Sequence, residues 1–260
     1  MVSPTSRPVR SARRMLLGYT TWLAAIGLIA AGAGAETVDD IVARHVEARG
    51  GLERIEAVRS IRMTGRANAG PGRDALVLRE IKRPDRIRTE FTVQGMTGVY
   101  AFDGESGWEV SPFLGRMDPE PMSPRSARQA REQADVAGPL VDWRAKGHRV
   151  ALVGRETVEG REAYRLEVTL AGGTVRHDSI DAESFLLVKT ESTRLVRGHE
   201  RKIVTAFSDY RSVEGLLFPH VIVASAGDAA RRLKVVVETV ELNPTLDDSR
   251  FEMPEMEPTQ

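Results

Sequence analysis

The chain has 260 residues, with 37 Lys and Arg against 37 Asp and Glu, 41% hydrophobic residues and no cysteine. The balanced charge argues against a nucleic-acid-binding protein, which needs a basic surface. The missing cysteines exclude a disulfide-stapled domain and a zinc or iron–sulfur site built on thiolates. The hydrophobic content is too high for a disordered chain, so we expect an ordinary globular protein.

The first 35 residues have the features of a secretory signal peptide. Four arginines between residues 7 and 14 precede an apolar run over residues 15–31, and Ala33-Gly34-Ala35 provides the small residues of a cleavage site. The run is short for a membrane span of about 20 residues, so we expect cleavage after Ala35 and not an uncleaved anchor. Arg13-Arg14 fits a twin-arginine signal poorly, and the choice between the two export routes stays open.

The chain after the signal, residues 36–260, is mildly acidic, with 33 Lys and Arg against 37 Asp and Glu. It contains no Gly- or Ser-rich linker and no change of composition, so a single domain is expected. We expect this domain to be a periplasmic protein.

The domain begins with helices and continues with strands. Thr37 and Asp40 match a capping box, and Gly50-Gly51 ends the first helix. A short second helical turn follows over residues 52–58. From residue 60 onward apolar and polar side chains alternate, which predicts about a dozen strands joined by tight turns, in a large antiparallel meander. These strands are predicted at 60–67, 74–82, 85–94, 98–102, 107–111, 148–153, 162–170, 174–180, 185–191, 201–210, 217–224 and 233–242.

One insert interrupts the meander. Three prolines at 119, 121 and 124 precede a helix-prone stretch over residues 126–134 and an apolar stretch over residues 138–145. A sheet of this size must close as a barrel or bury its concave face under helices. We therefore expect the helices to cover an apolar cavity, and such cavities hold hydrophobic ligands.

A catalytic or metal site is not indicated. No two of the five histidines have the i, i+4 spacing of a helical zinc motif. His177-Asp178-Ser179 has the residue types of a hydrolytic triad, but on a strand Asp178 would point away from the other two. Asp247-Asp248 lies in a turn-rich run and favours turn formation over metal binding. The sequence thus predicts no enzyme and no cofactor.

Several motifs resemble those of a known family. Ile81-Lys82-Arg83-Pro84 looks like a Lys-Arg-Pro strand end. Tyr100-Ala101-Phe102-Asp103-Gly104 with Trp108 looks like an Asp-Gly…Trp hairpin, and Ser111-Pro112-Phe113 continues it. Gly215-Leu216-Leu217-Phe218-Pro219 and the region from Asn243-Pro244 to Pro254 look like a late hairpin and a C-terminal signature. In this order they resemble LolA-type lipoprotein carriers and the related outer-membrane lipoprotein-sorting proteins.

The resemblance implies a curved, unclosed half-barrel of about eleven antiparallel strands, mainly β with a few helices, which form a lid. It implies a periplasmic carrier that takes the acyl chains of lipoproteins from an inner-membrane exporter to an outer-membrane acceptor. It also implies that Arg83 bonds helix carbonyls and keeps the empty cavity closed. Residues 118–146 match no lid segment of the family, so the lid contacts and the cargo are not carried over.

Apolar residues on the expected inner face are the candidates for contact with acyl chains, and each could equally be ordinary core. They are Phe91, Phe102, Trp108, Phe113, Leu140, Trp143, Tyr164 and Leu166. We expect a monomer. Two other functions stay open: a sensor of the same fold that binds lipoproteins and an envelope-stress partner, and a hydrolase of envelope lipids.

Overall fold

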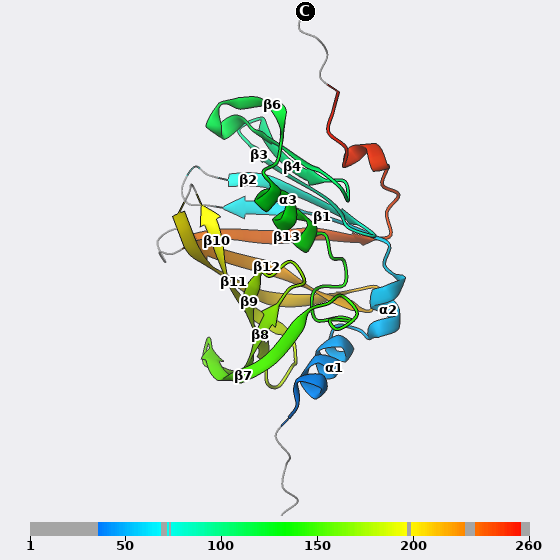
Figure 1. Cartoon of the computed structure of the whole chain (residues 1–260), viewed down its shortest axis with the longest axis vertical. Helices are drawn as coiled ribbons and strands as arrows, with labels where there is room; N and C mark the ends of the chain where they lie inside the picture. The colour runs from blue at the N-terminus through cyan, green and yellow to red at the C-terminus, as the bar shows by residue number, and fades with distance from the viewer. Residues whose placement is uncertain (1–35, 69–71, 73, 197–198, 227–231, 256–260) are drawn as a thin grey trace, which may run out of the picture. The chain divides into compact units, whose positions relative to one another are not determined.

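The computed structural model describes residues 36–68, 72, 74–196, 199–226 and 232–255. The expected signal segment, residues 1–35, lies outside these described residues. Within the unit Glu36–Gln260, thirteen strands form one antiparallel sheet. Its two edges are β6 (Arg116–Pro121) and β7 (Arg149–Val158), which do not pair with each other, so the sheet stays open (Figure 1). This confirms the predicted mainly β fold, an antiparallel half-barrel with helices.

Two meanders build the sheet and meet at its centre, where β1 pairs with β13. The first contains β1 (Ser60–Asn68), β2 (Asp74–Lys82), β3 (Arg86–Val93), β4 (Met96–Phe102), β5 (Gly107–Ser111), the 3-10 helix η1 (Pro112–Leu114) and β6. The second contains β7, β8 (Arg161–Thr169), β9 (Val175–Asp181), β10 (Leu187–Val196), β11 (His199–Val213), β12 (Leu216–Ala226) and β13 (Arg232–Leu242), followed by the 3-10 helix η2 (Asp248–Arg250).

Two helices precede the sheet. α1 (Val38–Ala48) begins with the predicted capping box, in which the side chains of Thr37 and Asp40 accept each other's backbone N–H. α2 (Leu52–Ala57) follows a glycine pair. Gly50 has φ 120°, and a Cβ there would collide with the carbonyl of Gly215. Glycine therefore lets the end of α1 pack directly on the turn between β11 and β12.

The connection between the two meanders crosses the sheet. Because β6 and β7 lie at opposite edges, residues 122–148 must pass over one face, which we call the inner face. They include α3 (Pro124–Gln133), close to the helix predicted at 126–134. α3 contacts β3, β4 and β5, and Glu132 near its end accepts a hydrogen bond from Thr174, between β8 and β9, at 2.6 Å. The helix thus bridges the two meanders (Figure 1).

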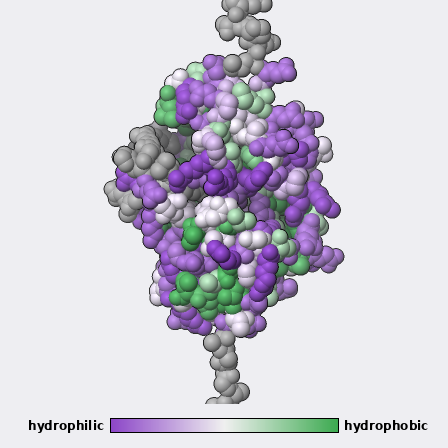
Figure 2. Space-filling view, viewed as in Figure 1, coloured by the Kyte–Doolittle hydropathy of each residue, from purple (hydrophilic) through white to green (hydrophobic). Residues whose placement is uncertain are grey.

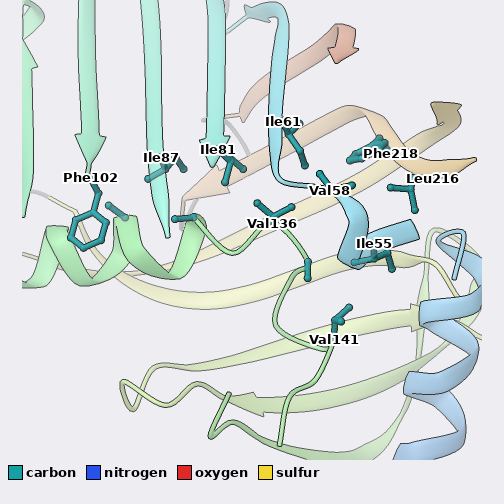
Figure 3. Packing of buried hydrophobic residues seen from close by; sticks show 13 residues of the cluster. Ile55, Val58, Ile61, Ile81, Ile87, Phe102, Val136, Val141, Leu216 and Phe218 are labelled. Carbon is teal, nitrogen blue, oxygen red and sulfur yellow. The ribbon is translucent and has the colours of Figure 1, made fainter. Parts of the chain in front are cut away.

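The helices α1 and α2 and residues 122–148 together form the cover of the inner face. Two clusters of apolar side chains fill the space between this cover and the sheet. Strands β1 to β4, β12 and α2 supply the first, which packs against α3 and the residues after it. Figure 3 shows Ile61, Ile81, Ile87 and Phe102 on the strands. The second joins α1 to β8 and β9 and includes Ile41, Leu140, Tyr164 and Leu166. Each fully buried aliphatic side chain contributes about 1.5–3 kcal/mol, so these clusters hold the cover in place.

The C-terminal residues pack on the opposite, outer face. Trp108 of β5 donates its indole N–H to the carbonyl of Phe251 at 2.8 Å. Glu80 of β2 is fully buried there and accepts hydrogen bonds from Arg62 at 2.9 Å and from Arg250 at 2.8 Å. A buried carboxylate therefore fastens the C-terminal segment to the sheet.

One strand differs from the expectation. The prolines at 119, 121 and 124 indicate an interruption of the meander, whereas residues Arg116–Pro121 form β6. Proline lacks the N–H that a central strand must donate, but an edge strand tolerates it. β6 has β5 as its one neighbour in the sheet, which explains how a proline-rich stretch can be a strand.

Candidate functional site

An apolar pocket of about 550 Å³ opens on the inner face among strands β1 to β5 and β13. Its volume lies within the range of small-molecule binding sites. We call it the apolar pocket. Its lining consists of Ala67, Ala75, Phe91, Val93, Gly98, Val99, Tyr100, Glu109, Val110, Ser111, Phe113 and Leu233.

Alternation along the strands produces the apolar walls. Phe91 and Val93 of β3 share the inner face with the buried Ile87, because successive side chains of a strand point to opposite faces. Ala67 of β1 lies directly opposite Ala75 of β2. These two small side chains leave a space that larger ones would fill.

Phe113 forms one side of the apolar pocket. Its ring lies against Gly98, where a Cβ would come within 3.0 Å of it, so the missing side chain at 98 makes room for the ring. Phe113 remains 48% exposed. Glu109 is the one carboxylate among the lining residues described, and its charge is compensated by Arg116 at 3.1 Å.

Arg83 connects the start of the sheet to α2. Its Nε donates to the carbonyl of Val58 at 2.7 Å, and a terminal guanidinium nitrogen donates to the carbonyl of Ile55 at 3.2 Å. These carbonyls belong to the end of α2, where the last turn lacks intrahelical donors. Hydrogen bonds from a charged donor are among the stronger ones in proteins, so Arg83 fixes the end of the helix.

Two further arginines hold α3. Arg79 of β2 donates to the carbonyl of Gln133, at the last residue of α3, at 3.1 Å. Arg131 donates to the carbonyl of Gly104 at 2.6 Å and lies over the ring of Phe102. Guanidinium–carbonyl contacts therefore add to the apolar clusters in holding the cover of the inner face.

Three solved structures are similar to this chain over most of their length. A LolA superfamily protein from Nitrosomonas europaea has 15% identity and a TM-score of 0.55, over 84% of this chain and 98% of that chain. A DUF1329 family protein from Desulfovibrio piger has 13% identity and a TM-score of 0.57, over the same shares. An outer membrane lipoprotein-sorting protein domain from Vibrio parahaemolyticus has 13% identity and a TM-score of 0.53, over 81% and 94%.

The fold is LolA-like. The resemblance that the sequence motifs indicate is thus confirmed at the level of the fold. No model of a protein family matches the chain, and no curated protein does. What the LolA-like fold does in this protein has to be argued from its own residues.

Two of the eight predicted cavity residues line the apolar pocket, namely Phe91 and Phe113. Tyr100 lines it as well, although it is not among the predicted cavity residues. The sequence does indicate this position, because Tyr100 and Phe102 are two residues apart on a strand and so share a face. Pairing with Thr89 of β3 places Tyr100 on the inner face.

The other six predicted residues lie outside the apolar pocket. Leu140 and Trp143 line a second pocket, of about 580 Å³, beside α1. Trp108 lies on the outer face, under the C-terminal segment. Three residues are buried in the clusters of the inner face: Phe102, Tyr164 and Leu166.

The residues with hydrolytic chemistry do not meet. Ser179 donates to Glu156 at 2.6 Å, Asp178 accepts from Arg176 at 2.8 Å, and His177 lies 3.5 Å from Glu167. Within the described ranges, no three His, Asp or Glu side chains are grouped as a metal site would require. In the same ranges, no helix has the length and apolarity needed to cross a membrane.

His45 of α1 makes the stability depend on pH. It is buried, and its Nδ1–H donates to the carbonyl of Phe185 at 2.8 Å. Burial, together with the nearby Arg49 cation, lowers the pKa of His45 from 6.5 to about 4. The unfolded chain therefore binds this proton more readily than the folded one. The contribution of His45 is fully present above about pH 6.5 and is lost as the pH falls toward 4.

We expect this loss to reach about 2 kcal/mol between pH 7 and pH 4.5. His45→Gln removes the titrating group, so urea unfolding of the variant should show a smaller decrease in stability over this interval. The contribution of the carboxylates to this decrease is the same in both proteins, so it cancels in the comparison. An equal decrease in variant and wild type would contradict the role of His45.

Proposed function

We propose that the protein is a periplasmic carrier that binds acyl chains of lipoproteins, or of a related lipid, and moves them toward the outer membrane. The observation that supports this proposal is an apolar pocket on the inner face of a LolA-like sheet that a crossing helix covers. The similar domain from Vibrio parahaemolyticus is named as an outer membrane lipoprotein-sorting protein, which agrees with this role.

The free energy of binding comes from the burial of acyl chains. Each acyl CH₂ that leaves water gains about 0.8 kcal/mol, so a chain binds wherever an apolar wall such as that of Phe91, Tyr100 and Phe113 is accessible. Entry of a chain beyond this open pocket, under the helices of the inner face, then requires the cover to move. Arg83, by bonding the end of α2, favours the closed arrangement when the apolar pocket is empty.

The carrier role implies a route. Residues 1–35 would direct export and be removed after Ala35, and residues 36–260 would act as a single monomeric domain between an inner-membrane exporter and an outer-membrane acceptor. Binding and release of acyl chains involve no covalent step. The protein would therefore act without a cofactor and not as an enzyme.

A substitution at Phe91 tests the proposal. Phe91→Asp places a charge in the apolar wall and should weaken uptake of a fluorescent fatty acid at least tenfold, because a carboxylate is costly to bury. Thr92→Asp is the matched control, since Thr92 lies next in β3 and faces the other side. Native mass spectrometry of protein purified without detergent should show acylated peptide or lipid on the wild type. Equal uptake by both variants, or none by the wild type, would refute the carrier role.

A further inference from the structure

A third cavity, of about 730 Å³, lies between α3 and strands β9, β10 and β11. We call it the polar groove. Figure 2 shows that hydrophilic residues dominate the surface around α3. Five cations line the groove against three carboxylates, and the carboxylate of Asp178, which pairs with Arg176, reduces the excess to one positive charge. The cations are Arg125, Arg128, Arg165, Arg176 and Lys202, and the carboxylates are Glu132, Glu191 and Glu200.

Two of these cations, Arg125 and Arg128, have no carboxylate within ion-pair distance among the described residues. Arg125 and Arg128 lie three residues apart on α3, so their side chains project from the same side of the helix. Both are exposed, and neither forms an ion pair with any residue whose position the structure describes. The stem of Arg128 packs on the turn between β8 and β9, where a Cβ at Gly172 would lie 3.3 Å from it. This contact positions the guanidinium group over the groove.

Most of the remaining charges are already paired. Glu191 contacts Arg165 at 2.8 Å and Lys202 at 3.1 Å. Although burial opposes it, these contacts hold the pKa of Glu191 at about 2. Arg176 is fixed by Asp178 at 2.7 Å and by the hydroxyl of Thr190 at 3.0 Å. Among the described lining residues, the charges that form no ion pair are therefore those of Arg125 and Arg128 on α3 and of the carboxylates Glu132 and Glu200.

The polar groove is connected to the apolar pocket along the inner face. Leu233, in the wall of the apolar pocket, lies opposite Ala224 of β12, which lies opposite Thr205 of β11. Thr205 in turn lies opposite Thr190 of β10, in the polar groove. Directly opposed residues share a face, and three strand spacings amount to about 14 Å. This distance is shorter than a long acyl chain, so one amphiphile can occupy both sites.

We propose that the polar groove binds the anionic phosphate head group of the amphiphile whose acyl chains occupy the apolar pocket. Guanidinium groups suit phosphate because they donate several N–H bonds in one plane to its oxygens. Arg125 and Arg128 would make these bonds from the helix side of the groove. The inference rests on the proposed carrier function and adds a preference among lipids.

Calorimetric titration of the purified protein with three probes tests the inference: dodecyl phosphate, the neutral monolauroylglycerol, and inorganic phosphate. The wild type should bind dodecyl phosphate about tenfold more tightly than monolauroylglycerol. R125Q/R128Q should lose this preference and leave the binding of monolauroylglycerol unchanged. Arg59→Gln is the matched control, because Arg59 is an exposed arginine close to the end of α2 that does not line the groove. Added NaCl should weaken the binding of dodecyl phosphate selectively.

The possible results separate the two proposals. Equal affinity for both amphiphiles, unchanged in R125Q/R128Q, would overturn the head-group site and leave the carrier function intact. Inorganic phosphate that binds as tightly as dodecyl phosphate would mean a site for free anions, and this also overturns the inference. If neither amphiphile binds, both proposals fail. Phe91→Asp should weaken the binding of both amphiphiles, because their acyl chains occupy the apolar pocket.

Discussion

Replacement of Glu80 by alanine should lower the free energy of unfolding by about 3 kcal/mol. The carboxylate is fully buried on the outer face, between Arg62 and Arg250. Removal of one member of a buried charge cluster typically costs about 3–5 kcal/mol. Arg62 and Arg250 keep 31% and 39% of their side-chain surface exposed, so water relieves part of their loss, and we expect the lower end of this range.

Urea unfolding followed by circular dichroism measures this loss. Glu238→Ala is the matched control, because Glu238 pairs with Arg66 at the same distance of 2.9 Å, but both side chains are exposed. Exposed pairs contribute about 0–1 kcal/mol, so this variant should unfold almost like the wild type. A similar loss in both variants would show that burial does not determine the strength of the Glu80 contacts.

Arg83→Met should bind a fluorescent fatty acid more tightly than the wild type, although the variant is less stable. Loss of the bonds to Val58 and Ile55 should cost about 3 kcal/mol or more, because charge-assisted hydrogen bonds contribute about 1.5–3 kcal/mol each. If these bonds hold the closed arrangement, their removal raises the fraction of open protein. Apparent affinity rises with that fraction, here by about tenfold or more.

Fluorescence titration and urea unfolding of the same variant separate this role from a structural one. If Arg83 were only a structural contact, the Arg83→Met variant should bind the fatty acid more weakly and also be less stable. Arg59→Met serves as the control, since Arg59 is an exposed arginine close to the end of α2. It should change neither quantity. Weaker fatty-acid binding by Arg83→Met would exclude the closing role.

The regular parts of the fold were predictable because their signals are local. The capping box at Thr37 and the alternation along β3 are complete within ten residues of sequence. β6 was not predictable, because its prolines argue against a strand in the middle of a sheet. Only an edge strand tolerates them, and which strand lies at an edge is a property of the whole sheet.

The candidate site was less predictable, since the face of a strand depends on its turns. Phe102 and Trp108 are both aromatic strand residues, yet they lie on opposite faces. The loop between them places Gly107 opposite Phe102, so the next residue, Trp108, must point outward. Tyr164 and Leu166 do lie on the inner face, but α1 and residues near Leu140 cover them, and this contact joins distant parts of the chain.

The crossing connection also determines how the protein can be divided. A cut between residues 142 and 147 would separate a piece of six strands from a piece of seven, and the β1–β13 ladder would still be available to join them. Most of the apolar pocket would belong to the first piece, and most strand residues of the polar groove to the second. The two pieces form a natural pair for split-protein complementation, in which an amphiphile that contacts both would promote their association.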